Sequence, residues 1–248
     1  MIKQLCFICL LGTTYSINTL ALELNSGSQQ TTLLELYTSE GCSSCPPADH
    51  WLSKFKSDRR LWQKIVPVAF HVDYWNWLGW HDRFSNPTYS ARQHNYRRYN
   101  YLNVVYTPGF VRNGREWRGW FEQQNLPINN TDVGILKAKI NKTGIQAKFT
   151  PSRPIQKPLV LNIALLGFNQ TSNIQQGENR GQLLKHDFVV MDFHQLPQST
   201  DKQEHHWQLA DISDNISTDV SGIAIWVTTE DDPTPLQATG GYLDVKKL

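Results

Sequence analysis

Two cysteines at the junction of a predicted strand and a predicted helix, Cys42 and Cys45, are the residues best suited to chemistry. A helix N-terminus presents unsatisfied backbone N–H groups and a partial positive charge, which stabilise a thiolate and lower the pKa of a cysteine placed there. Cys42 would act as the attacking nucleophile, and Cys45 would resolve the mixed disulfide. The spacing therefore predicts a redox-active dithiol, which requires no cofactor.

Metal binding is the competing interpretation of the cysteine pair. A tetrahedral structural zinc site needs four protein ligands, but the sequence has no second Cys-x-x-Cys and none of its eight histidines has ligand-like spacing with the pair. We therefore assign no zinc ligands. Reduced cysteines also suit a soft ion such as Cu(I), alone or with a distant histidine, so a metal-binding or metal-delivery module remains an alternative.

Three ionisable residues are candidates for handling the protons of the dithiol. His71 and Asp73 end a predicted strand, and ligands of open α/β sheets gather at the carboxyl ends of strands. Glu40 lies two residues before Cys42. Their competing interpretations are structural, with Asp73 capping the loop that follows it and Glu40 simply solvated.

The elements that must position the dithiol are predicted by hydrophobic patterning. Residues 33–37 form a short apolar run typical of a buried strand, and turn-forming residues follow it. A second strand-like run covers residues 65–73. Between the two runs, four apolar residues share one helix face at the i, i+3, i+4, i+7 spacing: Ala48, Trp51, Leu52 and Phe55. The unit is therefore strand–helix–strand, with the two strands parallel.

The chain after this unit predicts both helices and strands. Asn86-Pro87 indicates the start of a helix, and Asn113-Gly114 is typical of a hairpin turn. Residues 131–140 suggest a short closing helix. From residue 143 onward, strand-like runs follow one another without helices, at residues 145–149, 159–168, 183–193, 205–209, 223–229 and 236–243. This pattern predicts an antiparallel sandwich or an added sheet.

The segment 74–101 is unusually aromatic and gives a second alternative function. Its aromatic side chains could form a platform for a peptide or a sugar, rimmed by arginines, with the dithiol vestigial. The candidates are Trp75, Trp77, Trp80, Tyr96, Tyr99 and Tyr101, with Arg92, Arg97 and Arg98. Aromatic residues at helical spacing more often belong to a core.

Composition and the N-terminal segment bound the class of protein. With 24 Lys plus Arg against 22 Asp plus Glu among 248 residues, the net charge of +2 gives no basic face for a nucleic-acid partner. A lysine, the apolar run 5–11 and a small-residue stretch have the layout of a signal peptide over residues 1–21. Its cleavage would remove both other cysteines. We expect a secreted or periplasmic protein with no membrane span in its mature form.

The block around the dithiol resembles the thioredoxin superfamily in three features. They are residues 34–45 on strand, turn and helix, the pair Thr107-Pro108, and the hairpin at residues 111–116. The resemblance implies that Pro108 is cis and lies opposite the dithiol, where it and Thr107 would position a substrate strand. Two departures change proton handling, because Leu36 replaces the family's buried acidic residue and Gly41 its aromatic residue before the first cysteine.

More narrowly, the chain resembles a family of secreted bacterial thioredoxin-like proteins of unknown function. The matching motifs are residues 42–47, 70–75, 78–80 and 177–181. The resemblance implies an α/β thioredoxin-like domain over residues 30–142, with the aromatic segment as an insertion, and a β-rich, sandwich-like domain over residues 143–248. The function expected is an exported thiol–disulfide oxidoreductase. Its partners would be a protein or small-molecule thiol or disulfide substrate and a redox partner that recycles it.

Overall fold

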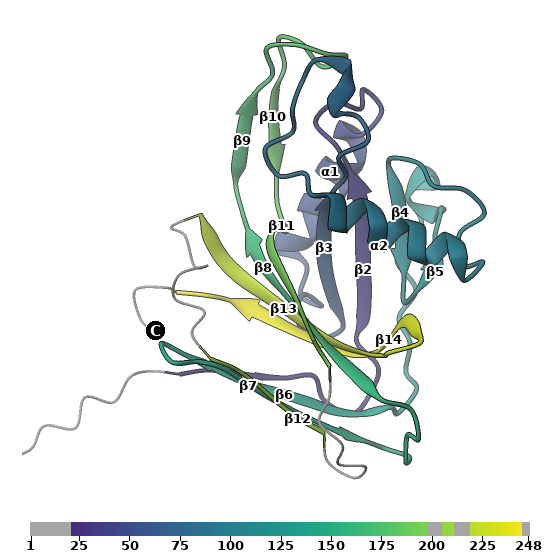
Figure 1. The fold of residues 1–248 in the computed structure, drawn as a ribbon, viewed down its shortest axis with the longest axis vertical. Coiled ribbons are helices and arrows are strands. Elements are labelled where there is room, and N and C mark those ends of the chain that lie inside the picture. The colour runs from purple at the N-terminus through teal and green to yellow at the C-terminus, as the bar shows by residue number, and fades with distance from the viewer. Residues whose placement is uncertain (1–20, 198–204, 211–218, 245–248) are drawn as a thin grey trace, which may run out of the picture.

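The computed structural model describes residues 21–197, 205–210 and 219–244, and its strands form three sheets of eight, four and two strands. Figure 1 shows the four-stranded sheet packed below the large sheet and the two-stranded hairpin extending from the opposite end. The signal peptide expected over residues 1–21 lies outside the described residues except for residue 21. No helix in the described part of the chain has the length and apolar character needed to cross a membrane.

The eight-stranded sheet holds the site, and its strand order is β14-β13-β8-β11-β3-β2-β4-β5. Its strands are β2 (Thr32–Thr38), β3 (Ile65–His71), β4 (Gly109–Arg112), β5 (Arg115–Glu116), β8 (Leu159–Gly167), β11 (Val189–Pro197), β13 (Val220–Thr229) and β14 (Asp232–Tyr242). Strand β3 pairs in parallel with both β2 and β11, and the remaining pairs are antiparallel. The sheet therefore crosses the domain boundary expected at residue 143.

The strand–helix–strand unit predicted around the dithiol is confirmed. Strand β2 leads through a turn into helix α1 (Pro46–Ser53), which continues as the 3-10 helix η1 (Lys54–Ser57) before the chain returns as β3. Ala48 and Leu52 of α1 and Phe55 of η1 are buried in the core that also contains Leu33, as the apolar spacing indicates. This packing fixes the N-terminus of α1 at the carboxyl end of β2.

Two local signals between residues 74 and 130 are also confirmed. Helix α2 (Pro87–Arg98) begins at Asn86, whose side chain accepts a hydrogen bond from the Thr88 N–H. Asn113 and Gly114, with φ of 44° and 80°, form the turn between β4 and β5. Two 3-10 helices complete this region, η2 (Asn76–Leu78) and η3 (Gly119–Glu122).

The closing helix expected over residues 131–140 is wrong, because this segment forms strand β6 (Gly134–Asn141). Its side chains alternate, with Leu136, Ala138 and Ile140 buried and the two lysines between them exposed. This period of two suits a strand whose one face is covered. Strand β6 pairs with β1 (Leu22–Asn25) and β7 (Gly144–Pro151), and β12 (His205–Ala210) completes this four-stranded sheet.

Two hydrophobic cores lie on opposite faces of the large sheet. One core contains α1, α2 and alternate residues of the strands, including Ala164 and Leu166 of β8. The other core lies between the eight-stranded and four-stranded sheets. It contains Ile163 and Leu165 of β8 together with Leu136 and Phe149 of the four-stranded sheet. The fold is thus β-rich, and the strands after residue 143 build both the sandwich and part of the sheet that carries the site.

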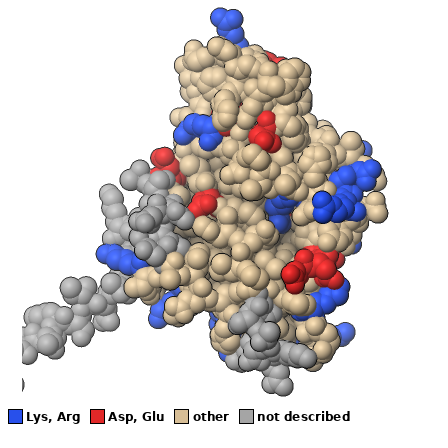
Figure 2. Space-filling view, in the orientation of Figure 1, with Lys and Arg blue, Asp and Glu red and all other residues tan. Residues whose placement is uncertain are grey.

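The two-stranded hairpin of β9 (Gln170–Asn173) and β10 (Leu183–His186) brings a distant part of the chain to the dithiol. It extends beyond the large sheet and lies beside α1 (Figure 1), which β10 contacts. On the face shown in Figure 2, lysine and arginine side chains are scattered among uncharged residues and form no continuous basic area on the described surface.

Candidate functional site

Cys42 and Cys45 form a disulfide at the N-terminus of α1, with 5.4 Å between their Cα atoms. Cys45 is the N-cap residue of the helix, and Pro46 and Pro47 occupy its first turn. Proline is tolerated there because the first backbone N–H groups of a helix have no partner within it. Both cysteines are buried, with 1% or less of each exposed.

The turn of the β9–β10 hairpin directly contacts residues 40–45, which carry the two cysteines and which we call the dithiol segment. The buried Asn179 side chain donates hydrogen bonds to the carbonyl oxygens of Glu40 and Cys42, at 2.8 and 3.0 Å. The exposed Glu178 carboxylate accepts from the Ser43 N–H at 3.1 Å, and the hydrogen bonds from Ser43 lower the pKa of Glu178. A turn contributed from the second half of the chain thus holds the segment that carries the two cysteines.

The Thr107–Pro108 peptide is cis, as the resemblance implies. Gly109, the next residue, pairs with Tyr37 of β2, so this loop lies at the end of the sheet from which the dithiol segment begins. Trp75 joins the two segments, because its Nε1–H donates to the Thr107 Oγ1 at 2.7 Å. A side chain at Gly41 would begin only 3.0 Å from the Trp75 Cβ, so glycine is what allows this tryptophan to approach.

A buried ion pair between His71 and Asp82 lies next to the dithiol segment. The His71 Nδ1 and the Asp82 Oδ2 are 2.7 Å apart, and neither side chain is exposed. The same carboxylate oxygen accepts from the Glu40 N–H at 2.9 Å. Burial alone would raise the pKa of Asp82, but the histidine and the N–H donors outweigh burial, so the pKa lies below its usual value.

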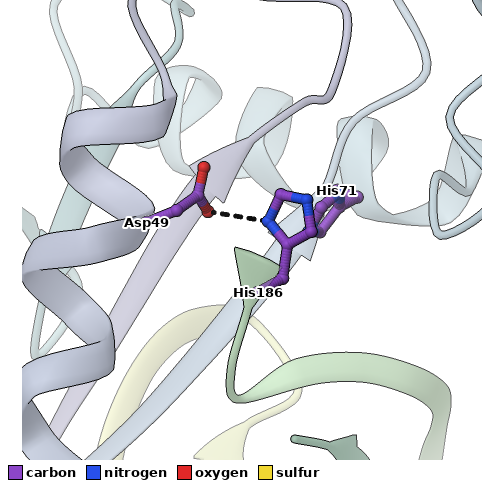
Figure 3. A group of neighbouring side chains, drawn as sticks. All are labelled: Asp49, His71 and His186. Atoms are coloured by element: carbon purple, nitrogen blue, oxygen red, sulfur yellow. Dashed lines mark ion pairs between the residues drawn. The ribbon is translucent and has the colours of Figure 1, made fainter. Parts of the chain in front are cut away.

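His186, on β10, lies between two buried carboxylates. Its Nε2 is 3.5 Å from the Glu40 Oε1 and its Nδ1 is 3.6 Å from the Asp49 Oδ1, the latter contact being drawn in Figure 3. Burial favours the neutral ring, but the two carboxylates raise the pKa of His186 to about 10. Glu40 is also held by Trp80, whose Nε1–H donates to its Oε2 at 2.7 Å. Burial would raise the pKa of Glu40, yet contacts led by His186 lower it.

The three residues expected to handle protons therefore have different positions. The structure brings Glu40 and His71 into one buried cluster with Asp49, Asp82 and His186, which we call the carboxylate–histidine cluster. Asp73 lies outside it, because its carboxylate and its N–H both bond to the Ser90 hydroxyl of α2.

Three members of the cluster were not found by sequence reasoning. Asp49, Asp82 and His186 come from α1, a loop and β10, so no fixed spacing connects them with the cysteines. The family-like motif at residues 177–181 is the sequence signal that lies in this hairpin, but the motif alone assigns no function to its residues. Only the pairing of β9 with β10 shows why this hairpin matters to the dithiol.

The aromatic residues of segment 74–101 do not share one surface role. The Trp80 indole N–H donates to Glu40 next to the cysteines, the Trp75 indole N–H donates to Thr107 before the cis proline, and Tyr96 is fully buried. Trp77 is 79% exposed and Tyr99 is 38% exposed. Much of the aromatic excess therefore serves to position the loops around the cysteines.

One arginine of the same segment is part of a second buried network. The Arg92 Nε donates to the Glu35 Oε2 at 2.7 Å, and Tyr96 and Tyr37 also donate to this carboxylate. Burial and the carboxylate together hold the pKa values of both tyrosines well above their usual value. Arg92, which lies on α2, thus forms a buried structural ion pair with Glu35.

Comparisons with known proteins identify relatives by family and by fold. The family model described as "Protein of unknown function (DUF1223)" matches residues 33–228. The crystal structure of protein AGR_C_4864 from Agrobacterium tumefaciens is similar, with a TM-score of 0.63 and 25% identity, over 84% of this chain and 92% of that chain. HBP35 of Porphyromonas gingivalis shares the fold, with a TM-score of 0.56 and 17% identity, over 87% of this chain and 76% of that one. Among the curated proteins, none matches.

Proposed function

The chain belongs to the family described as proteins of unknown function (DUF1223), and we propose that it is an exported thiol–disulfide oxidoreductase with a thioredoxin-like core. The observation that carries the proposal is the disulfide between Cys42 and Cys45 at the N-terminus of α1. A bridge across so short a loop constrains the unfolded chain little, so its value for stability is small. Reversible redox chemistry is the better account of the pair.

The architecture around the disulfide supports the thioredoxin-like part of the proposal. The parallel unit β2-α1-β3 comes first in the chain, the loop with the cis Thr107–Pro108 peptide follows it, and the β4–β5 hairpin comes after that loop. These are the three features on which the sequence resemblance rests. Trp75, packed against Gly41, places an aromatic side chain beside the first cysteine, where this sequence has lost the family's usual one.

The reduced dithiol would act in two steps. The Cys42 thiolate attacks one sulfur of a substrate disulfide, which forms a mixed disulfide and releases the first substrate thiolate. Cys45 then loses its proton and attacks the Cys42 sulfur, which releases the second substrate thiol and leaves the oxidised pair. A recycling dithiol reverses the sequence and returns two electrons and two protons to the cysteines.

The carboxylate–histidine cluster is the group to which we assign proton handling in these steps. Glu40 precedes Cys42 by two residues, and the Asp49 N–H bonds to the Cys45 carbonyl oxygen at 3.1 Å within the first turn of α1. The proposal gives this role to Glu40 and His71 as members of the cluster, with His186 between the Glu40 and Asp49 carboxylates. Asp73 is left out because Ser90 holds it.

Export is supported by the signal-like residues 1–21 and by the chemistry itself. Disulfides persist in oxidising compartments such as the periplasm and the extracellular space, and they are rare in the cytosol. The segments that surround the dithiol come from both halves of the chain, so the mature protein would act as a unit.

Trapping of mixed disulfides tests the function. Cys45→Ser should accumulate a mixed disulfide between Cys42 and a model disulfide substrate, because the resolving thiol is missing, whereas Cys42→Ser should not. The same assay with the wild type should show turnover. The proposal is overturned if neither the wild type nor Cys45→Ser exchanges, and tight stoichiometric Cu(I) binding with slow exchange would indicate the metal-delivery alternative.

A further inference from the structure

Three buried side chains from separate elements converge beside the dithiol. Asp49 lies on α1, His71 ends β3 and His186 ends β10. One ligand atom from each lies within 4.8 Å of the others, and the three residues are 6%, 0% and 2% exposed. Figure 3 shows the His186 ring between the Asp49 carboxylate and the His71 ring.

The His71 and Asp49 side chains are each held by a hydrogen bond at one atom, so that a second atom of each could bind a metal. The His71 Nδ1 bonds to Asp82, and its Nε2 has no hydrogen-bond partner. The Asp49 Oδ2 accepts from the Thr38 hydroxyl at 2.9 Å, which leaves the Oδ1 for His186. In metal-binding histidines, the N–H of the ring nitrogen that does not bind the metal usually donates a hydrogen bond to a carboxylate in this way, because that bond fixes the ring and its tautomer.

Several buried polar atoms of the cluster form ion pairs or ring contacts but have no hydrogen bond. His186 has no hydrogen bond from either ring nitrogen, because both carboxylate contacts are 3.5 Å or longer. The Glu40 Oε1 is also buried without a hydrogen bond. A buried polar atom without a hydrogen bond is destabilising, so several in one place indicate that a further group completes the cluster.

The charge of the cluster indicates what that group is. Glu40, Asp49 and Asp82 are all buried, and in the described part of the chain their ion pairs are with histidines, never with lysine or arginine. Phe84 lies against both imidazole rings, with centroid distances of 5.2 Å to His71 and 5.9 Å to His186. A cation in this dry, negative environment would interact strongly with the carboxylates.

We propose that Asp49, His71 and His186 bind a divalent transition-metal ion of the Zn²⁺ class, with the Glu40 carboxylate next to the open position. Two imidazoles and one carboxylate form a donor set that suits Zn²⁺ and neighbouring ions. This site does not use the cysteines. It therefore differs from a Cu(I) site built on the thiols, but it shares Asp49, His71 and His186 with the cluster to which the proposed function gives proton handling.

The test uses the oxidised mature protein without residues 1–21, because Cys6 and Cys9 are then absent and the disulfide between Cys42 and Cys45 cannot supply thiolate ligands. After treatment with a chelator, Zn²⁺ is titrated calorimetrically, and Co²⁺ is added as a spectroscopic probe. We expect one ion per chain, a rise in thermal unfolding temperature with bound metal, and cobalt d–d bands without thiolate charge-transfer absorption.

Variants locate the ion. His186→Gln should weaken Zn²⁺ binding by more than about 100-fold, and Asp82→Asn, which frees the His71 ring, by about 10–100-fold. The control is His81→Gln, since His81 is an exposed neighbour of Asp82. If His186→Gln does not fold, the graded loss in a folded Asp82→Asn decides the question.

Three results would overturn the metal site. They are no binding by the folded oxidised protein, binding that only His81→Gln removes, and binding that appears only after reduction, which would place the ion on the cysteines. The exchange assay is scored separately, so failure of the metal site and failure of the redox function remain distinguishable.

Discussion

The turn of the β9–β10 hairpin is hydrogen-bonded to the segment that carries the buried disulfide, and we predict that Asn179→Ala increases access to it. The Asn179 amide makes two hydrogen bonds to the carbonyls of Glu40 and Cys42 from a fully buried position. Each such bond contributes about 0.5–1.5 kcal/mol net, so their loss weakens docking of the turn by about 1–3 kcal/mol. That free energy corresponds to an increase of about 5- to 150-fold in the population with the turn displaced.

The assay is the rate at which a small dithiol reduces the disulfide under native conditions, followed by thiol trapping. If reductant reaches Cys42 only when the turn is displaced, Asn179→Ala should be reduced faster by up to the same factor. The matched control is Gln175→Ala on the same hairpin, because Gln175 bonds only within the hairpin, to the Asn173 carbonyl. An unchanged reduction rate in a variant whose stability has fallen by the expected amount would refute the reasoning.

Two further variants test other parts of the structure. Glu178→Gln removes a negative charge from the N-terminus of α1, so the pKa of the Cys42 thiol should fall. The fall should be less than about one unit because the carboxylate is exposed. The rate of Cys42 alkylation against pH measures this pKa, and a rise in the pKa would contradict the account. Arg92→Met leaves the Glu35 carboxylate buried without its cation and should cost about 3–5 kcal/mol in denaturant unfolding. The exposed Arg97→Met on the same helix should change stability by less than about 0.5 kcal/mol, and equal losses in the two variants would show that the buried pair is not what matters.

The local elements could be predicted from sequence where one short pattern determines each of them. The apolar run before Cys42, the helix start at Asn86 and the Asn113-Gly114 turn each depend on adjacent residues, and all three were confirmed. Residues 134–141 were misread because Leu136, Ala138 and Ile140 alternate with lysines as in a strand, while Leu, Ala and Lys also have high helix propensity. Burial of one face of the segment decides between the strand and the helix, and the sequence alone does not show that burial.

The candidate site was predictable only in part, because its members are joined by tertiary pairing. Cys42 and Cys45 carry their own signal, and Glu40 lies next to them. Asp49 and His186 carry none, since a helix residue and the last residue of β10 meet only after the hairpin packs on α1. The eight-stranded sheet likewise depends on β11 pairing with β3 over a long sequence separation, which local patterns do not encode.

The central claim is that Cys42 and Cys45 form a working redox couple, and its most direct test is the reduction potential of the pair. The mature protein is equilibrated with glutathione buffers of known poise, and its thiols are trapped and counted. The account predicts reversible equilibration of the native protein at a finite potential, between about −120 and −270 mV as in other dithiol oxidoreductases. A disulfide that cycles only after denaturation would contradict it.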